Sequence, residues 1–294
     1  MLHTLDLQFL VDHAIASFII ESEDGPIVIE SGPHSTFPQL AKGLHTLGYE
    51  VSDVKHLLLT HIHFDHAGAA WAFAKEGATV YVHPRGHKHL MDPERLYGSA
   101  KRIYGNMMEQ LWGQMHGIPE EQLVIVEHGD KFELGGQDFT AWHTPGHASH
   151  HIAWQWEDQI FAGDVAGVKI EGGPVSPPCP PPDINLEAWN ESIDLLLSLR
   201  PATLHLTHFG EVTNVEAHLE QLRTILNEWA AWIKPHWEQG RDMNLVTPEF
   251  QAYAAEQLRA GGIHEAGITR YEAANPAWMS VAGLYRYWSK KTDA

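Results

Sequence analysis

The sequence predicts a chain of α/β or α+β layers with an appended helical subdomain. Up to about residue 210, short apolar segments typical of strands alternate with helical segments, whereas from about residue 211 onward only helical patterns remain. A run of strands and helices followed by helices alone is the pattern expected of a layered core with an extension. The sequence shows no repeat of fixed period, so a solenoid or a propeller is not expected.

Hydrophobic runs and the residues that end them place the individual elements. β-Branched apolar runs predict strands, and periodic runs that stop at a glycine predict helices. In the first 85 residues, strands are predicted at 5–11, 15–21, 26–29, 54–60 and 79–82, and helices at 36–47 and 67–76. The run over 54–60 is almost continuously apolar, which is typical of a strand buried on both faces.

The rest of the chain follows the same scheme after a helical insert at about 85–122. Further strands are predicted at 123–126, 131–134, 138–142, 151–156, 159–162 and 202–207, and helices at 185–199, 213–239, 247–260 and 275–290. The Pro/Gly-rich stretch 171–183 predicts an extended surface loop. We therefore expect a domain over 1–210 and a C-terminal helical extension over 211–294.

Composition narrows the class of protein. The 294 residues have 44% hydrophobic content and a formal net charge of −19, which indicates a folded chain that binds neither nucleic acid nor an anionic membrane. The single cysteine excludes an internal disulfide and a cysteine-rich zinc module. No run of about 18 apolar residues is present, and the first 20 residues lack a basic segment. These features predict a cytoplasmic protein.

Histidine is the unusual component, with 22 copies. The strongest local pattern is His61-Ile62-His63-Phe64-Asp65-His66, directly after the predicted buried strand. Because side chains at i and i+2 of an extended chain point the same way, His61 and His63 can converge on one ion. Asp65 and His66 then face a second position. Burying so many imidazoles without partners would be costly, which favours a metal-binding role.

Three further ligand-type residues follow predicted strands downstream. They are His147 in the segment 143–147 (HTPGH), Asp164 in 161–164 (FAGD) and His208 in 206–210 (LTHFG). Each one alone is weak evidence, but their joint occurrence at strand ends predicts that they share one rim of a sheet.

These motifs give residues 1–210 a resemblance to the metallo-β-lactamase superfamily. The resemblance implies a four-layer αββα sandwich with a metal pair at one edge. It implies that His61, His63 and His147 hold the first metal, that Asp65, His66 and His208 hold the second, and that Asp164 bridges both. Asp65 would also act in catalysis as a hydrogen-bond partner and proton shuttle.

The motif details separate branches of that superfamily. An aspartate at position 164 resembles the glyoxalase II, lactonase and phosphodiesterase branches, whereas metallo-β-lactamases themselves usually have Cys or Ser there. Only 43 residues separate Asp164 from His208, which leaves no room for the long insertion of nucleases. Glu30 stands where the family commonly has Asp, and we expect it to support the metal loop with a longer arm.

The remaining histidines and the single thiol receive structural interpretations. We expect His205 to be packed and His83, His87 and His89 to lie in a solvated loop. His143 is expected either to contact the metal ligands without binding metal itself or to have a capping or core role. One of His150 and His151 is expected to line the pocket while the other faces solvent. Cys179 lies among prolines and is not expected to be a nucleophile.

The predicted function is hydrolysis of a small ester, thioester or lactone by hydroxide bridging two divalent ions, Zn²⁺ by preference and Mn²⁺ or Fe²⁺ as alternatives. Alternatives are a mononuclear iron oxygenase of the persulfide dioxygenase kind, a phosphodiesterase and a metal-binding protein without turnover. The insert and the tail are expected to form the pocket for a small-molecule substrate, and the C-terminal helices could form a homodimer.

Overall fold

The computed structural model describes residues 1–292 and divides the chain into two compact units. The first unit comprises residues 1–143 and 150–161, and the second comprises residues 144–149 and the chain from residue 162 onward. Each unit contributes part of the predicted ligand set: the hexapeptide at 61–66 belongs to the first unit, and the ligands at 147, 164 and 208 belong to the second. The boundary expected at residue 210 stays a prediction.

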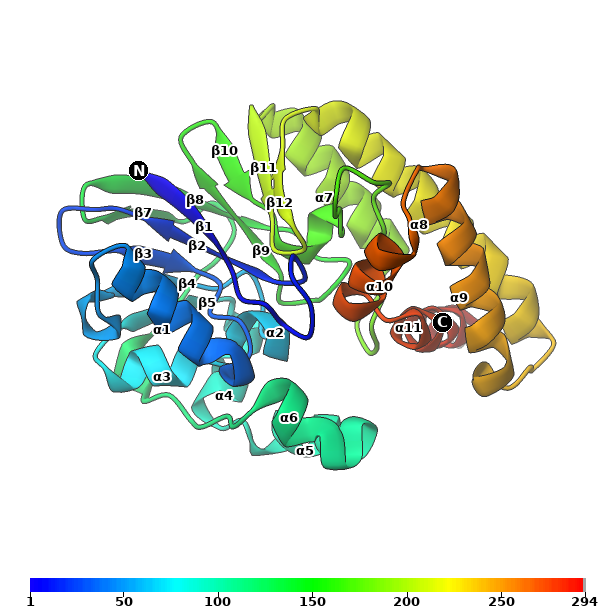
Figure 1. Ribbon diagram of the computed structural model, residues 1–294, viewed down its shortest axis with the longest axis horizontal. Coiled ribbons are helices and arrows are strands. Elements are labelled where there is room, and N and C mark those ends of the chain that lie inside the picture. Colours follow the sequence, from blue (N-terminus) through cyan, green and yellow to red (C-terminus); the bar gives the residue numbers. More distant parts are fainter. Residues whose placement is uncertain (293–294) are drawn as a thin grey trace. The chain divides into compact units, whose positions relative to one another are not determined.

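A six-stranded sheet forms the centre of the first unit (Figure 1). Its strands lie in chain order: β1 (Leu2–Asp6), β2 (Ala16–Ile20), β3 (Ile27–Ile29), β4 (His56–Leu58), β5 (Thr79–Val82) and β6 (Leu123–Ile125). β1 to β3 pair antiparallel and β3 to β6 pair parallel. Every residue of β2 and β3 is buried, as expected for strands covered on both faces. The carboxyl ends of β3 and β4 are neighbours, so the segments after them, 30–32 and 59–66, emerge side by side.

Helices and a second set of strands complete the first unit. The helices are α1 (Phe37–Thr46), α2 (Phe64–Ala67), α3 (Ala70–Lys75), α4 (Pro84–Met91), α5 (Glu94–Tyr104) and α6 (Met108–Trp112). β7 (Lys131–Leu134), β8 (Gln137–His143), β9 (Ile152–Trp156) and β10 (Gln159–Phe161) form an antiparallel meander. Its fully buried Trp154 donates from Nε1 to the carbonyl of Leu59 at 2.9 Å, which ties the meander to the segment that leads into the hexapeptide.

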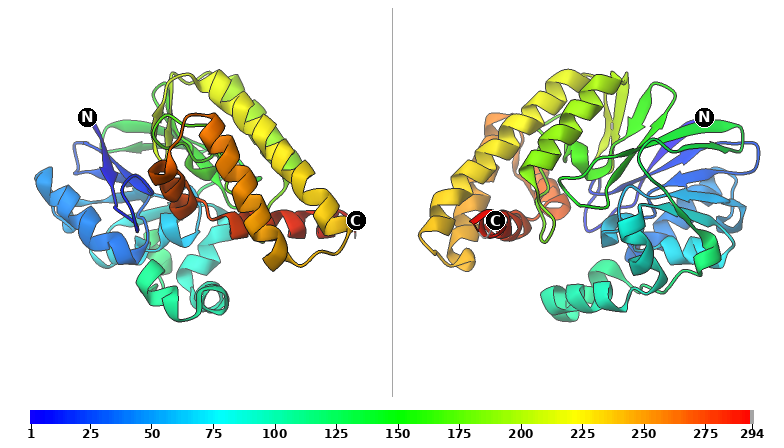
Figure 2. Two further views of the ribbon diagram at one scale, coloured as in Figure 1. Left: turned by 45° about the vertical axis from the view of Figure 1, so that its right-hand side comes forward. Right: turned by 180° about the vertical axis from the view of Figure 1, so that it is seen from behind.

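The second unit is mainly helical. It contains the 3₁₀ turn Gly163–Ala166, α7 (Leu186–Leu199), the antiparallel pair β11 (Thr203–Leu206) and β12 (Gly210–Val212), and the helices α8 (Val215–Glu238), α9 (Met243–Ala260), α10 (Glu265–Ala274) and α11 (Ala277–Thr292). The Asn185 side chain caps α7 by accepting from the Ala188 amide at 2.9 Å, and the Asp242 side chain caps α9 by accepting from the Asn244 amide at 2.8 Å. Figure 2 shows the long α8 beside α9, and α11 packs against both.

Three features of the second unit differ from the sequence prediction. Strand β12 lies where only helical structure was expected from about residue 211 onward. Helix α10 was not predicted, because it is short and has a glycine, Gly267, in its interior. The stretch 171–183 is irregular as predicted, but residues 175–179 are buried rather than on the surface. Gly283 of α11 makes this possible: a Cβ at that position would lie 1.9 Å from the Cys179 carbonyl oxygen.

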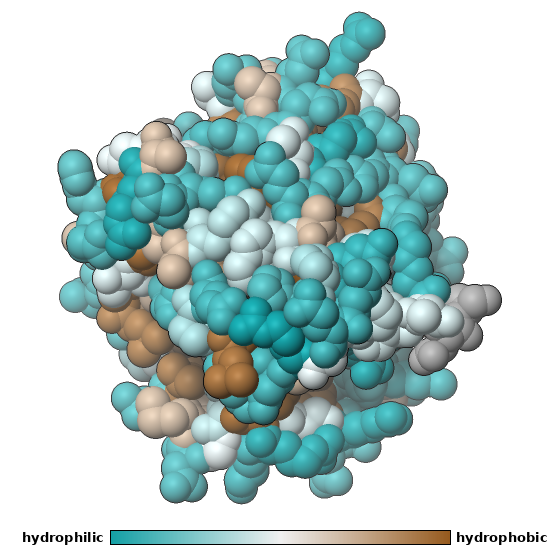
Figure 3. Space-filling view, turned by 90° about the vertical axis from the view of Figure 1, so that its right-hand side faces the viewer, coloured by the Kyte–Doolittle hydropathy of each residue, from teal (hydrophilic) through white to brown (hydrophobic). Residues whose placement is uncertain are grey.

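No helix within residues 1–292 is both long enough and apolar enough to cross a membrane. Seen from the side of the C-terminal helices, the surface is largely hydrophilic and its apolar residues occur in small groups (Figure 3). The homodimer expected through these helices stays a prediction.

Candidate metal centre

The hexapeptide lies at the end of β4 and runs into a short helix. His61 lies in the loop after β4, His63 occupies the N-cap position of α2, and Asp65 and His66 lie in the first turn of that helix. The sequence predicted one helix over 67–76, whereas the structure has the short α2 over Phe64–Ala67 and a separate α3 over Ala70–Lys75.

The imidazoles of the hexapeptide converge within the first unit. His61 Nε2 lies 2.9 Å from His63 Nδ1, and the ring centroids of His61 and His66 are 3.9 Å apart. The Asp65 carboxylate lies 3.6 Å from His66 Nε2. Three ring nitrogens and a carboxylate therefore gather in a small volume, as the sequence predicted for this motif.

Buried polar partners orient two of these rings. The Glu30 side chain is fully buried, with one oxygen 3.0 Å from His66 Nδ1 and the other accepting from the Thr60 amide at 3.2 Å. Because Glu30 engages Nδ1 of His66, Nε2 is the nitrogen left for a metal ion. The Thr60 hydroxyl lies 3.0 Å from His61 Nδ1 and directs that ring in the same manner. The expectation that Glu30 supports the metal loop agrees with these contacts; the contribution of Thr60 was not predicted, although it directly precedes the motif.

In the second unit, His147 is positioned by a turn that only glycine can form. Gly146 has a φ of +136°, and a Cβ there would lie 2.4 Å from the Trp189 Cα atom of α7. His147 Nδ1 lies 2.8 Å from the carbonyl of Pro178, which leaves Nε2 for a metal ion. The sequence did not predict the contact with Pro178, because the composition of a proline-rich loop does not show which of its carbonyls will contact another residue.

Asp164 lies between two imidazoles of the second unit. One carboxylate oxygen is 3.2 Å from His147 Nε2 and the other is 3.3 Å from His208 Nε2. All three side chains are buried. The Asp164 carboxylate therefore lies next to both predicted imidazole ligands of this unit, with one oxygen toward each.

The donor chemistry of both clusters fits divalent metal ions. The described residues contain histidine and aspartate sets whose ligand atoms could hold an ion. Imidazole nitrogens and carboxylate oxygens suit Zn²⁺, Mn²⁺ and Fe²⁺, and hydrogen bonds to the distal ring nitrogens are typical of metal-binding histidines. His66 and His147 both show this feature.

Several histidines outside the predicted ligand set are buried, contrary to expectation for some of them. His83 and His87 were expected in a solvated loop, but each is only 8% exposed and both belong to the start of α4. His83 Nδ1 accepts from the Arg85 amide at 3.2 Å, and its ring stacks on His143. Burial is the main reason why the pKa of His83 falls to about 4.

The structure also bears on the predictions for the other histidines and for Cys179, and it agrees with only some of them. His150 and His151 are both buried, so neither faces solvent as had been expected of one of them. His205 is fully buried, as predicted for a packed residue, and burial lowers its pKa to about 4. Cys179 is buried and its pKa is raised by burial, which agrees with a thiol that is not a nucleophile.

The helical insert contacts the hexapeptide within the first unit. Phe64, between ligands His63 and Asp65, packs in one cluster with Ala100 of α5 and Met108 of α6. Trp112 stacks on Phe9 at a centroid distance of 5.2 Å and joins the insert to the segment between β1 and β2. The insert is therefore anchored beside ligand-bearing residues.

Comparison with known families establishes the class of protein to which this fold and these motifs belong. The family model of the metallo-beta-lactamase superfamily matches residues 11–208, and the chain belongs to this superfamily. The chain thus has the α/β sandwich fold of that superfamily, with C-terminal helices in addition.

Individual relatives agree with this assignment. The metallo-beta-lactamase fold-containing protein ST1585 of Sulfurisphaera tokodaii is 30% identical over 173 residues, which are 57% of this chain and 66% of ST1585, and its crystal structure matches with a TM-score of 0.61 over 75% of this chain and 85% of that one. The family protein TTHA1429 of Thermus thermophilus matches 99% of this chain and 94% of its own, with a TM-score of 0.73 and 20% identity, which shows the shared fold. An N-acyl homoserine lactonase of a Bacillus species is 31% identical over 165 residues, 48% of this chain and 58% of the lactonase.

Proposed function

We propose that this chain is a metallohydrolase that holds two divalent ions and cleaves a small ester, thioester or lactone. In this proposal His61, His63 and His147 bind one ion, Asp65, His66 and His208 bind the other, and Asp164 bridges them. The observation that carries the proposal is the placement of Asp164, one oxygen to His147 and the other to His208. When bound, the ions supply hydroxide at neutral pH and polarise the substrate carbonyl.

The chain's own residues prepare and assist that chemistry. Glu30, Thr60 and the Pro178 carbonyl fix the ring orientations of His66, His61 and His147, so the ligands do not need to reorganise when substrate arrives. Asp65 is a carboxylate with 22% of its side chain exposed, and we assign its carboxylate the transfer of a proton.

The ester, thioester or lactone class is supported by three features. The bridging position is occupied by aspartate, and a relative that aligns with about half of this chain is named as a lactonase. The insert adds an apolar wall of Tyr97, Tyr104, Met108, Trp112 and Met115 beside the ligand loop. An uncharged substrate with an apolar acyl group matches this wall better than a charged phosphodiester does.

A substrate panel with metal controls tests the proposal. Purified protein loaded with Zn²⁺ or Mn²⁺ is assayed against esters, thioesters, lactones and phosphodiesters, before and after chelation. The proposal expects turnover of an uncharged acyl substrate that chelation abolishes and metal restores. About one iron per chain together with oxygen consumption on a persulfide would instead identify the oxygenase alternative, and preferred cleavage of phosphodiesters would contradict the substrate class.

A further inference from the structure

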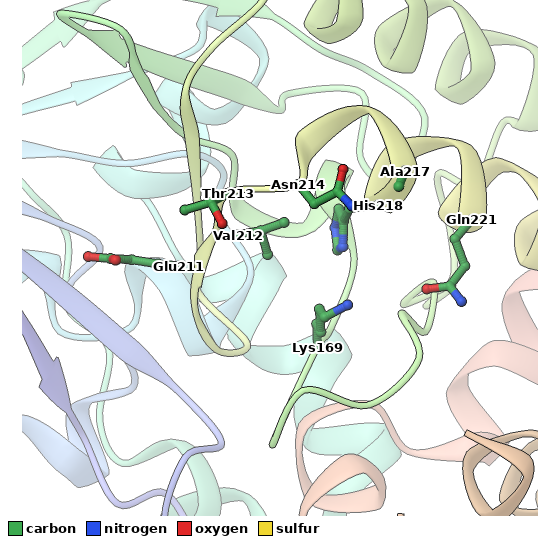
Figure 4. Close-up of a pocket in the computed structure, with 8 residues that line it drawn as sticks. All are labelled: Lys169, Glu211, Val212, Thr213, Asn214, Ala217, His218 and Gln221. Atoms are coloured by element: carbon green, nitrogen blue, oxygen red, sulfur yellow. The ribbon is translucent and has the colours of Figure 1, made fainter. Parts of the chain in front are cut away.

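The second unit contains a pocket of about 360 Å³ between β12 and the first turns of α8 (Figure 4). Its volume lies in the range of small-molecule sites. It is lined by Lys169, Glu211, Val212, Thr213, Asn214, Ala217, His218 and Gln221. None of these residues belongs to the predicted ligand set, so the proposed hydrolysis gives the pocket no role.

Lys169 supplies a positive charge to this pocket. Its side chain is partly buried, and within residues 1–292 it has no carboxylate partner in an ion pair. An anion beside this partly buried ammonium group would offset part of the cost of its burial. Figure 4 shows its ammonium group on the side of His218, whereas the carboxylate of Glu211 points away from both.

His218 supplies a hydrogen-bond acceptor. It is 3% exposed, and its Nε2 lies 2.8 Å from the carbonyl of Ala166, so Nε2 carries the proton and Nδ1 carries a lone pair. Among the described residues, buried Nδ1 has no hydrogen-bond partner. Burial and the neighbouring Lys169 lower the pKa of His218 to about 4, so the ring is neutral at pH 7 and Nδ1 accepts rather than donates. A buried acceptor of this kind is costly unless a ligand or water donates to it.

The start of α8 adds favourable groups for an anion. This helix has 24 residues, and the side chain of its N-cap residue Asn214 makes no capping hydrogen bond. The amides of the first turn carry partial positive charge, which stabilises a negative group nearby. The hydroxyl of Thr213 lies on the same wall of the pocket.

We infer that this pocket binds a small hydroxycarboxylate, whose carboxylate lies against Lys169 and the start of α8 while its hydroxyl donates to Nδ1 of His218. The combination of a cation, a helix start and a buried neutral acceptor matches an anion that also carries a hydrogen-bond donor. This inference is independent of the proposed hydrolysis, because binding here requires neither turnover nor a metal ion.

The pocket is joined to the ligands of the second unit through the backbone. The Ala166 carbonyl that holds His218 belongs to the 3₁₀ turn of Asp164, and the Lys169 amide donates to the His208 carbonyl at 2.6 Å. An occupant that fixes Lys169 and His218 therefore restrains the segments that carry two of the predicted ligands.

Titration calorimetry of the metal-loaded full chain with 3-hydroxybutyrate tests the inference. We expect one site per chain, and butyrate, which lacks the hydroxyl, to bind at least five-fold more weakly. Lys169→Met should weaken 3-hydroxybutyrate binding at least ten-fold, whereas the control Lys42→Met, at an exposed lysine of α1, should leave it unchanged.

Nitrogen NMR of the histidine rings supplies a second readout that does not depend on a variant folding. The His218 Nδ1 resonance of the wild-type chain should shift on addition of 3-hydroxybutyrate and remain in place with butyrate. Absence of binding at tens of millimolar, equal binding by Lys169→Met, or binding that disappears when the metals are removed would overturn the inference, since the last two results place the anion at the metal ions.

Discussion

At the scale of single residues, Glu30 shows how a buried carboxylate prepares a ligand. It has no exposed surface, and its two oxygens are divided between His66 Nδ1 and the Thr60 amide. A buried carboxylate is costly unless it is hydrogen-bonded, and here it also orients the ring of a predicted metal ligand. The longer arm of Glu, compared with the Asp common at this position, reaches His66 at 3.0 Å.

Replacement of this carboxylate by an amide is the sharpest test of that role. Glu30→Gln keeps the size of the side chain but lowers the basicity of His66, so we expect metal affinity to fall by about 10–100-fold. Competition with a fluorescent chelator measures it. Glu21→Gln is a matched control, because Glu21 contacts His3 at 2.8 Å near the surface; equal affinity in both variants would contradict the role of Glu30.

Residue patterns identified candidate ligands, but they did not predict which histidines are buried. The hexapeptide and the motifs around residues 147, 164 and 208 could be read directly, because each combines several ligand-type side chains at a strand end. His83 and His87 were assigned to solvent because a polar histidine gives no local sign of burial. The structure buries them at the start of α4, where a histidine nitrogen caps the helix.

At the scale of elements, the turn over 144–147 positions a ligand through close packing. Gly146 lies so near α7 that any side chain would collide with the Trp189 backbone. We expect Gly146→Ala to lower the free energy of unfolding by about 1–3 kcal/mol through overpacking and to reduce metal content, because His147 must move.

A glycine with similar backbone strain but open surroundings provides the control for that variant. Gly48 has a φ of +89°, and a Cβ at that position would meet no atom within 4 Å, so Gly48→Ala should cost only about 1 kcal/mol and leave metal content unchanged. Denaturant unfolding and metal analysis of both variants measure the difference. Equal metal content in the two variants would show that the contact with α7 does not position His147.

The helical insert is the second element with a testable role. Trp112 stacks on Phe9 and lies 6.0 Å from the Phe64 ring, so Trp112→Ala opens the apolar wall beside the ligand loop. We expect KM to rise more for esters with long acyl chains than for acetates, with metal content unchanged. A uniform loss of kcat across chain lengths would indicate a structural role instead.

Elements were predicted reliably where hydrophobic periodicity and caps agreed. The helices α1, α7 and α8 and most strands match their predicted ranges within a few residues. Helix α10 was missed because Gly267 weakens its pattern, although that glycine is needed where Ile263 and Glu171 lie close to the helix. Burial of residues 175–179 depends on Gly283, which lies about a hundred residues further along, and no local pattern encodes such a contact.

At the scale of the whole molecule, three buried histidines contribute to the dependence of stability on pH. His83, His205 and His218 each have a pKa of about 4, mainly through burial, against about 6.5 in an unfolded chain. Between these values the unfolded chain binds more protons than the folded one. The stability is therefore complete above about pH 6.5 and decreases as the pH falls toward 4, by at most about 1.4 kcal/mol per pH unit for each histidine.

Urea unfolding of the metal-free protein at several pH values between 7.5 and 5 measures this decrease. Metal-free protein is used so that loss of bound metal at low pH does not contribute to the result. His205→Gln should make the dependence shallower, because one of the three buried rings is removed. His45→Gln, at an exposed position of α1, should leave it unchanged. A stability that is constant from pH 7.5 to 5 would contradict the account.

The most direct test of the central claim is the metal content of the purified chain by mass spectrometry. The account predicts about two divalent ions per chain in the wild type, and a loss of at least one ion in His63→Ala, Asp164→Ala and His208→Ala, with no loss in the control His45→Ala. Two ions per chain in Asp164→Ala and His208→Ala would contradict the assignment of these residues as ligands.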